Sequence, residues 1–296
     1  MPETIDAQEP GGPLDEDCAP STKLRPGQPQ PARVYNALLG GKDNFPADRE
    51  AAEQALLDFP TLKVTARENR LFLARAVRYC AQDEGIRQFL DIGTGIPAQG
   101  STHEIAQAIA GEEATRVVYV DNDPIVLVHA RALLQGAGAC RTFYLEGDLR
   151  DPQPILSAAR AHLDFDRPIA LLLVAVLHFV EDSDDPYGIV RQLLDALPAG
   201  SLLVLSHATG DYRPAEARRL VATYRERGMS AQARSRTEVD RFVQGLEIVA
   251  PGVQTVSRWR PDPGAEQPRS ADVSCFGVIA RKPGPPPSTT ASGDLT

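Results

Sequence analysis

Strand-like and helix-like segments alternate through the middle of the chain, and this alternation limits the fold more than any other feature of the sequence. Because parallel strands need crossover helices between them, the alternation predicts a doubly wound α/β domain with a mostly parallel sheet. The strand-like runs are RQFLDI (87–92), RVVYVD (116–121), TFYLEGD (142–148), 169–177 and SLLVLSH (201–207). The helical segments start near residues 102 and 152 and cover residues 124–135, 186–196 and 213–227.

The end of this region departs from the alternation. VQTVSRWRP (253–261) and DVSCFGVIARK (272–282) are strand-like runs with no helical pattern between them. They predict an antiparallel pair that closes one edge of a seven-stranded sheet.

Helical patterns also precede the first strand. The segment from 31 to 39 starts with Pro and ends at two glycines, as helices often do. Further helices are expected at 46–58 and 65–82. The predicted organisation is a disordered tail, an N-terminal helical cap, an α/β core and a second disordered tail, at residues 1–30, 31–84, 85–282 and 283–296.

Composition excludes several classes of function. The formal net charge is −9, which gives no electrostatic reason to expect binding to nucleic acid or to a membrane surface. The four cysteines form no C-x-x-C pair, which predicts a reduced cytoplasmic protein without a metal site or disulfide framework. The N-terminus lacks a signal-peptide pattern, and the longest apolar run, 169–177, is too short to cross a bilayer.

The stretch FLDIGTGIPAQG (89–100) ends the first predicted strand. In an open parallel sheet, ligands bind at the carboxyl ends of the strands, so Asp91, Gly93, Thr94 and Gly95 are candidates for a cofactor loop. The two glycines are expected to let the backbone approach a ligand because they lack a Cβ atom. Pro97 stands where many such loops carry a third glycine.

The spacing from Gly93 through Gly95 to Ala98 also fits a dinucleotide fingerprint. Three features argue against an NAD-dependent oxidoreductase. Asp91 would repel a pyrophosphate. A capping box from Ser101 to Glu104 places the helix start near residue 102, too far along for the helix N-terminus to meet a pyrophosphate. The antiparallel closing pair is not expected of a plain dinucleotide fold.

Two further acids follow the next two strands. Asp121, with Asn122 beside it, is placed to accept hydrogen bonds from both hydroxyls of a ribose. Asp148 is placed to accept one from an adenine amino group, with the backbone amide of Leu149 near a ring nitrogen. Each acid alone could be an ordinary polar residue at a strand end. Three acids closing three successive strands are a more specific pattern, typical of a site for an adenosine-containing cofactor.

This pattern resembles the Rossmann-like class I S-adenosylmethionine-dependent methyltransferases. Within them, the sequence is similar to one bacterial S-adenosyl methyltransferase family, long described as a domain of unknown function. The resemblance spans about residues 31–282. It is carried by ARVYNALLGGKDNFPADREAAEQAL, ARENRLFLARAVRY, FLDIGTGIPAQGSTHEIAQ, VVYVDNDPIVLVHARALL and GLEIVAPGVQTVSRWRP.

The resemblance implies the cofactor S-adenosylmethionine and a role for each strand-end motif. Asp91, Gly93 and Gly95 would hold the methionine part, Asp121 the ribose, and Asp148 with Leu149 the adenine. Pro97 departs from the general class I loop but matches the narrower family, and position 97 is expected to begin a rigid connector. The acceptor is expected to be a small molecule that the sequence does not identify, and the oligomeric state stays open. A non-catalytic module that binds the same cofactor is the alternative.

Catalytic candidates are fewer, because the cofactor supplies the reactive group. His178 follows the central strand and is either a general base or a structural histidine, and His207 has the same two interpretations. Tyr35 could face the acceptor or pack between helices. The acids of EDSDDP (181–186) are interpreted as a helix cap at Asp185 and solvated residues, with no metal.

The stretch YNALLGGKDNF (35–45) has two interpretations. Its glycines and Asn44 could simply end one helix and start another. Alternatively, Gly41, Lys42, Asp43 and Asn44 belong to a lid that closes over the pocket, and the family resemblance favours the lid. Asn69 and Arg70, on the third helix, are weaker candidates.

Overall fold

The computed structural model describes residues 24–128 and 141–284. One mixed sheet runs through the molecule in the order β3-β2-β1-β4-β5-β8-β6, with β7 also paired to β8. Strands β1 to β5 are all parallel to one another, and β8 is antiparallel to β5. The strands are β1 (Gln88–Ile92), β2 (Arg116–Asp121), β3 (Thr142–Glu146), β4 (Ala170–Val174), β5 (Leu202–Ala208), β6 (Glu247–Ile248), β7 (Gln254–Thr255) and β8 (Cys275–Arg281).

Helices cover both faces and one end of this sheet. The α-helices are α1 (Pro31–Leu38), α2 (Pro46–Asp58), α3 (Leu62–Arg78), α4 (Thr102–Ala110), α6 (Pro152–Ala159), α7 (Pro186–Asp195), α8 (Pro214–Glu226), α9 (Arg236–Arg241) and α10 (Ser270–Val273). Shorter turns are η1 (Tyr79–Asp83), η2 (Leu177–Phe179), η3 (Asp182–Asp184) and η4 (Val256–Arg258). Of the helix predicted at 124–135, residues 124–128 are helical and the remainder lies outside the described residues.

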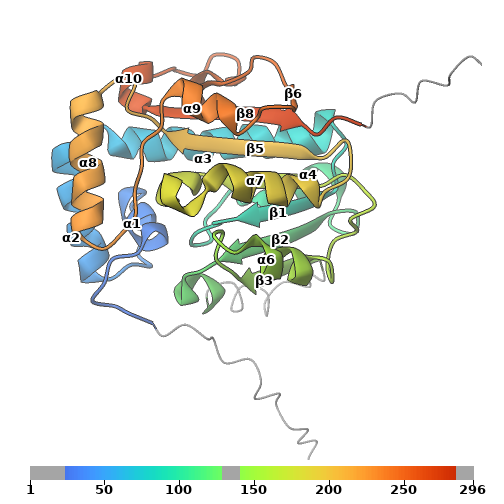
Figure 1. Cartoon of the computed structure of the whole chain (residues 1–296), viewed down its shortest axis with the longest axis horizontal. Coiled ribbons are helices and arrows are strands. Elements are labelled where there is room, and N and C mark those ends of the chain that lie inside the picture. Colours follow the sequence, from blue (N-terminus) through green and yellow to red (C-terminus); the bar gives the residue numbers. More distant parts are fainter. Residues whose placement is uncertain (1–23, 129–140, 285–296) are drawn as a thin grey trace, which may run out of the picture.

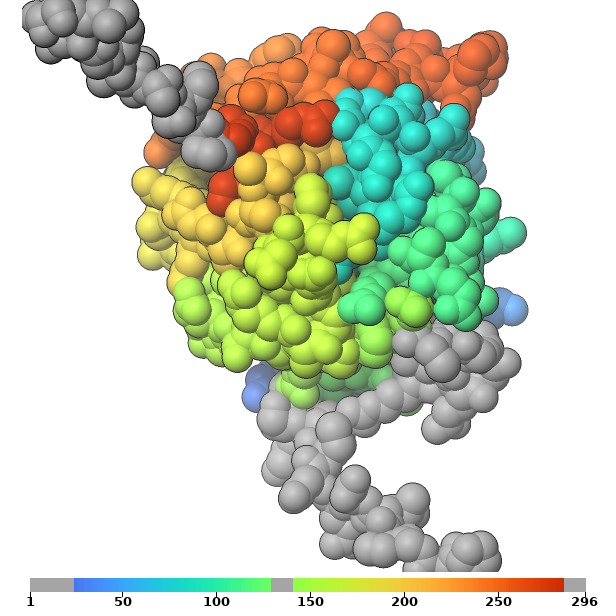
Figure 2. All heavy atoms as spheres, turned by 90° about the vertical axis from the view of Figure 1, so that its right-hand side faces the viewer, coloured from blue at the N-terminus to red at the C-terminus, as the bar shows by residue number. Residues whose placement is uncertain are grey.

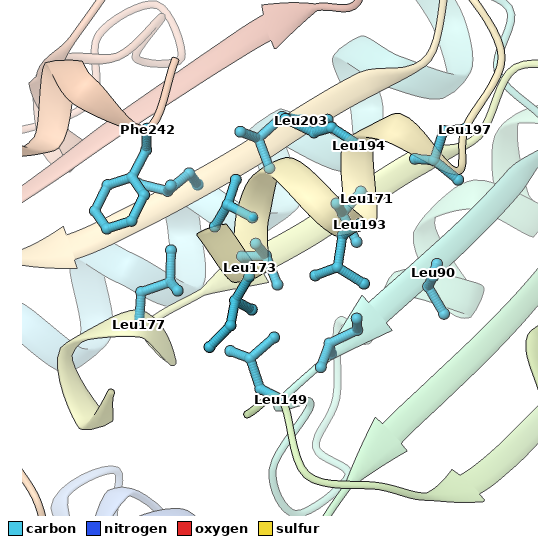
Figure 3. Packing of buried hydrophobic residues seen from close by; sticks show 14 of the residues in the cluster. Leu90, Leu149, Leu171, Leu173, Leu177, Leu193, Leu194, Leu197, Leu203 and Phe242 are labelled. Carbon is cyan, nitrogen blue, oxygen red and sulfur yellow. The ribbon is translucent and has the colours of Figure 1, made fainter. Parts of the chain in front are cut away.

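The parallel strands are apolar on both faces, as expected for strands covered by helices on each side. On β4, Leu171 and Leu173 join a core with α6, α7 and α9 (Figure 3), whereas Ala170 and Leu172 join a second core under α3 and α4. This two-sided burial fixes the register of the sheet, because a shift by one residue would exchange the two faces.

The predicted fold class is confirmed, with one difference at the edge. Among the described residues the sheet has eight strands where seven were expected, because the short β6, which was not predicted, also pairs with β8. The run at 253–261 forms only the two-residue β7 before turning into η4. The buried guanidinium of Arg75 donates hydrogen bonds of 2.7 and 3.0 Å to the carbonyls of Val256 and Trp259. These carbonyls therefore bond to a side chain instead of to a neighbouring strand.

A layer of helices lies at the carboxyl ends of the parallel strands. Figure 1 shows α1 and α2 there with α8 beside them, although α8 is distant in sequence. Their apolar contacts form a third core that includes Val34, Ala51 and Tyr224. Figure 2 looks at the opposite end of the sheet and shows almost none of the blue N-terminal segment. Helices α1 and α2 of the cap therefore lie at the end of the sheet where ligands bind in such folds, whereas α3 packs on a face of the sheet.

The cap is attached to the core by a buried arginine. Arg33 of α1 is 1% exposed, and its Nε lies 3.0 Å from a carboxylate oxygen of Asp123, in the loop after β2. Its Nη1 lies 3.5 Å from Asp48 of α2. The predicted tails lie mostly outside the described residues, but the amide of Gln30 donates to Asp48 at 3.0 Å. Residues before α1 thus take part in the same attachment.

Candidate functional site

A cavity of about 450 Å³ opens between the carboxyl ends of the strands and the cap. Its floor is the loop after β1 and its walls come from the ends of β2 and β4, from α1 and from α3. The three strand-end acids predicted from the sequence, Asp91, Asp121 and Asp148, all line it. Thr94, Gly95, Asn122 and Leu149 do so as well.

Asp91 is an acid held in an unfavourable environment. It is 5% exposed, and its Oδ2 accepts a hydrogen bond of 2.7 Å from the hydroxyl of Thr102, the first residue of α4. Burial raises the pKa of Asp91 to about 6, against the opposing effects of that bond and of the Arg70 charge. A cation bound beside Asp91 would favour its ionised form.

Asp121 orders the loop as well as lining the cavity. Its Oδ2 accepts from the amide of Gly95 at 2.8 Å, and its Oδ1 accepts from the amide of Asp123 at 2.9 Å. Burial again raises the pKa, to about 6. The carboxylate is therefore oriented by backbone groups, and its remaining lone pairs are available to a ligand.

The two glycines of the loop serve different purposes. Both have a positive φ, 74° at Gly93 and 69° at Gly95. A Cβ at Gly93 would lie 2.4 Å from Val176, so this glycine permits close packing between the loop and the segment after β4. A Cβ at Gly95 would meet nothing within 4 Å. Gly93 and Gly95 both line the cavity, so the expectation that they let the backbone approach a ligand stays a prediction for each.

Two expectations about the rest of the loop need correction. Pro97, expected to begin a rigid connector that has left the ligand, lines the cavity. The helix begins at Thr102 as expected, but the capping box does not form. Glu104 accepts from the amide of Gly100 at 2.7 Å instead of from the amide of Ser101.

Asp148 lies two residues beyond the end of β3, in a turn. It is more exposed than the other two acids, and the guanidinium of Arg150 lies 3.2 Å from its carboxylate. Leu149 is buried and belongs to the core shown in Figure 3. The carboxylate of Asp148 is thus held partly by a salt bridge. A ligand's adenine amino group would bond to the same carboxylate as Arg150.

The predicted lid stretch divides into two parts. Gly41 lines the cavity, as do Tyr35 and Asn36 of α1, whereas Lys42 and Asp43 are exposed and do not. Asn44 does not line it either, because its amide bonds to Asn36 at 2.8 Å and to the Gly41 carbonyl at 2.9 Å. The helix α1 itself, rather than the polar stretch after it, closes over the cavity.

A second cavity, of about 100 Å³, adjoins the first. It lies among α1, α3, η2 and α8, and both His178 and Tyr35 line it. The two cavities share a wall made of Pro31, Tyr35, Asn69, Ala175 and Phe179.

Tyr35 takes part in a chain of hydrogen bonds that crosses this wall. Its hydroxyl donates to the carbonyl of Ala66 at 2.9 Å and accepts from Asn69 at 3.1 Å. The hydroxyl of Ser206 donates to Asn69 at 2.6 Å and accepts from the amide of Ala175 at 2.9 Å. Burial raises the pKa of Tyr35 to about 12, so its proton stays on the oxygen near neutral pH. Asn69 and Tyr35 therefore hold the wall in shape.

His178 and His207 have different surroundings. In His178, Nδ1 is buried without a hydrogen-bond partner, and Nε2 is the nitrogen that remains accessible. Burial and the nearby Arg234 charge lower the pKa of His178 to about 4. His207 is fully buried; its Nδ1 donates to the Ala208 carbonyl at 2.7 Å and its Nε2 accepts from Arg234 at 2.9 Å. His207 is structural.

Arg234, which the sequence did not point to, supports the segment that carries His178. Its guanidinium is fully buried and also donates to the carbonyls of Leu177 and Val180 and to the carboxylate of Asp182, at 3.1, 2.9 and 2.7 Å. These bonds fix the turn that carries His178. No local sequence pattern marks Arg234 as buried. Arg236, two positions further along the chain, is also an arginine but is half exposed.

Comparison with known proteins decides the family. The sequence profile of the S-adenosyl methyltransferase family matches residues 17–283. The chain belongs to the S-adenosyl methyltransferase family. Its cofactor is therefore S-adenosylmethionine, as the family resemblance implied. Among curated protein sequences no relative was found.

Solved structures agree with this methyltransferase assignment. A family protein of unknown function from Streptomyces avermitilis is 46% identical, with a TM-score of 0.83 over 86% of this chain and 98% of its own. A candidate methyltransferase from Thermobifida fusca is 40% identical, with a TM-score of 0.80 over 87% and 96%. Magnesium protoporphyrin IX methyltransferase from Synechocystis, with S-adenosylhomocysteine bound, shares the fold at 12% identity, with a TM-score of 0.51 over 84% and 93%.

Within residues 24–128 and 141–284, no group of three or more His, Cys, Asp and Glu side chains could hold a metal ion. Every helix in the same residues is too short or too polar to span a bilayer.

Proposed function

We propose that the larger cavity holds S-adenosylmethionine and that the smaller one holds a small-molecule methyl acceptor. The convergence of three strand-end acids on one cavity carries this proposal. Asp91 would hold the ammonium of the methionine part. Arg70, whose guanidinium reaches the carbonyls of Gln99 and Gly100 on the same rim, would hold its carboxylate.

The other acids suit the rest of the cofactor. Asp121 has both oxygens oriented by backbone amides and would accept from the ribose hydroxyls. Asp148 and the amide of Leu149 would recognise the adenine edge. The raised pKa values of Asp91 and Asp121 support this fit, because both are buried carboxylates whose ionised form a bound ammonium or hydroxyl donor would favour.

The bound cofactor supplies an activated methyl group, and the chain's own residues orient the acceptor and exclude water. Positioning of this kind contributes roughly 7–11 kcal/mol to rate acceleration. Tyr35 and Asn69 hold the shared wall, and α1 covers it. Nε2 of His178 would take a proton from an acceptor hydroxyl. Because the pKa of His178 is about 4, it would be a weak base.

An NAD-dependent reaction is disfavoured by the start of α4. Glu104 already bonds to the Gly100 amide ahead of the helix, and Thr102 bonds to Asp91. A pyrophosphate would meet two carboxylates there in place of free amides.

A cytoplasmic location is part of the proposal and is supported by the free thiols of Cys80 and Cys275. The acidic net charge of −9 supports a small-molecule acceptor over a nucleic acid.

Calorimetric titration with S-adenosylhomocysteine tests the cofactor site. Asp121→Ala should weaken binding by ~1.5–3 kcal/mol, through the loss of hydrogen bonds to a charged acceptor. Asp166→Ala is the matched control, because Asp166 is an exposed acid in the turn before β4. Tighter binding of NAD than of S-adenosylhomocysteine, or equal affinities for the two variants, would overturn the proposal.

A further inference from the structure

The wall of the smaller cavity carries no charge. None of the described residues that line it is Asp, Glu, Lys or Arg. Most are apolar and come from segments far apart in sequence, such as Phe59, Leu62, Phe179, Leu220 and Tyr224. A charged ligand would lose its hydration there without gaining a counter-ion, which is strongly unfavourable.

The polar groups of this wall are nearly all engaged with neighbours. The Thr209 hydroxyl accepts from the amide of Asp211, and the Gln232 carbonyl oxygen accepts from the amide of Asp182. Tyr35 and Asn69 bond within the shared wall. His178 is different, because its ring makes no hydrogen bond to other described residues. With the hydroxyl of Tyr224 and the amide nitrogen of Gln232, it is one of the polar groups of the wall that a ligand can still engage, and it lies beside the wall that the two cavities share.

A hydroxyl is the neutral group that suits this imidazole. A neutral imidazole has one nitrogen that donates and one that accepts, and a hydroxyl can serve either. The volume of about 100 Å³ is somewhat smaller than the ~150 Å³ of a buried cavity that binds benzene. Because the two cavities share lining residues, a molecule with one ring in the smaller cavity would have its edge at the shared wall.

The backbone of the shared wall is unusual at one position. Ala175, directly after β4, has a φ of 56°, a left-handed conformation that is rare for residues with a side chain. The bond from its amide to Ser206 holds it there. Such strain persists only where surrounding structure imposes it, and it concentrates at ligand sites. Here it shapes the boundary across which cofactor and acceptor would meet.

We propose that the smaller cavity selects an uncharged acceptor with an apolar body of about one ring and a hydroxyl placed at His178. This inference rests on the proposed function, because it assigns the acceptor half of the same site. It excludes carboxylic acids, phosphates and amines that are charged near neutral pH from the part of the molecule that enters this cavity.

The test uses the full chain saturated with S-adenosylhomocysteine and four probes of similar size. Phenol and fluorobenzene are neutral, benzoate is an anion and benzylamine is a cation. Titrations followed by saturation-transfer NMR should give phenol a dissociation constant of about 1 mM, a range open to ligands this small. Benzoate and benzylamine should bind at least about tenfold more weakly, because of desolvation without a partner.

Variants then locate the binding. His178→Phe should remove the advantage of phenol over fluorobenzene, about fivefold for one hydrogen bond, and leave fluorobenzene binding in place. Ala217→Leu fills the cavity from α8 and should weaken both neutral probes. Ala222→Leu, at an exposed position of the same helix, should weaken neither. Thermal denaturation establishes that each variant is folded.

The outcomes separate the two proposals. If S-adenosylhomocysteine does not bind, the proposed function fails. If it binds, and either charged probe binds as tightly as phenol, the inference is overturned and the proposed function stands. The inference is also overturned if no neutral probe binds, or if phenol binding is unchanged in both Ala217→Leu and His178→Phe.

Discussion

The two cavities share a wall but are built from different parts of the chain and by different physical means. The larger one is lined by charged and polar groups that follow consecutive strands, and each carboxylate is oriented by backbone amides or a nearby hydroxyl. The smaller one is lined by uncharged side chains from α1, α3, η2 and α8, which tertiary packing brings together. One cavity is specified by local motifs, and the other by the way in which the cap folds onto the core.

If the cavities have separate roles, a change in the smaller one should leave cofactor binding intact. His178→Ala should lower turnover by about 10²-fold, at the weak end of general-base effects because its pKa is about 4. Release of S-adenosylhomocysteine with catechol as acceptor measures turnover, and calorimetry measures cofactor affinity. Activity that simply follows the folded fraction would make His178 structural.

In the larger cavity, a change at Asp91 should instead weaken cofactor binding. Asp91→Asn should weaken S-adenosylhomocysteine binding by about 10-fold to 100-fold, because a buried carboxylate facing an ammonium is lost. The ligand-free variant should be more stable at pH 7. In the wild type, the pKa of Asp91 is raised from 3.8 to about 6, so its contribution favours folding below pH 4 and is lost as pH rises through 6.

Removal of that charge should therefore raise the free energy of unfolding by about 1–3 kcal/mol at neutral pH. Urea denaturation of the ligand-free proteins at pH 7 and at pH 4 measures it. The gain should shrink at pH 4, where wild-type Asp91 is already protonated in the folded state. A variant less stable than wild type at both pH values would contradict the assignment of Asp91 as a strained site residue.

Cofactor affinity should depend on pH for the same reason. Asp91 and Asp121 both have pKa values raised to about 6, and binding favours their ionised forms. Affinity for S-adenosylhomocysteine should fall by about tenfold per pH unit below 6 for each acid that must ionise. Titrations at pH 5, 6 and 7 should give a shallower slope for Asp91→Asn than for the wild type. If the affinity does not change between pH 5 and pH 7, neither acid changes its protonation on binding.

The contrast between the cavities also explains what the sequence can predict. The strand–helix alternation and the acids at strand ends are local patterns, so the sequence alone is enough to group Asp91, Asp121 and Asp148 at one edge of the sheet. The strand predicted at 253–261 forms only in part, because two of its carbonyls accept hydrogen bonds from Arg75, which is far away in sequence. Arg33 and Arg234 escape prediction for a similar reason. Burial of an arginine depends on distant partners, and no local pattern distinguishes it from an exposed one.

The smallest effect concerns the cap, whose helix α1 lines both cavities. Arg33 pairs with Asp123, whose amide bonds to Asp121 in the cofactor cavity. A ligand held by Asp121 should therefore stabilise this pair and slow local opening of α1. We expect amide exchange across 31–44 to slow several-fold when S-adenosylhomocysteine binds, in addition to protection at 91–95 and 121–123. Arg33→Met should abolish the slowing in α1, whereas Arg67→Met, which removes an exposed arginine of α3, should not. Protection confined to the strand ends in the wild type would make α1 a fixed wall rather than a lid.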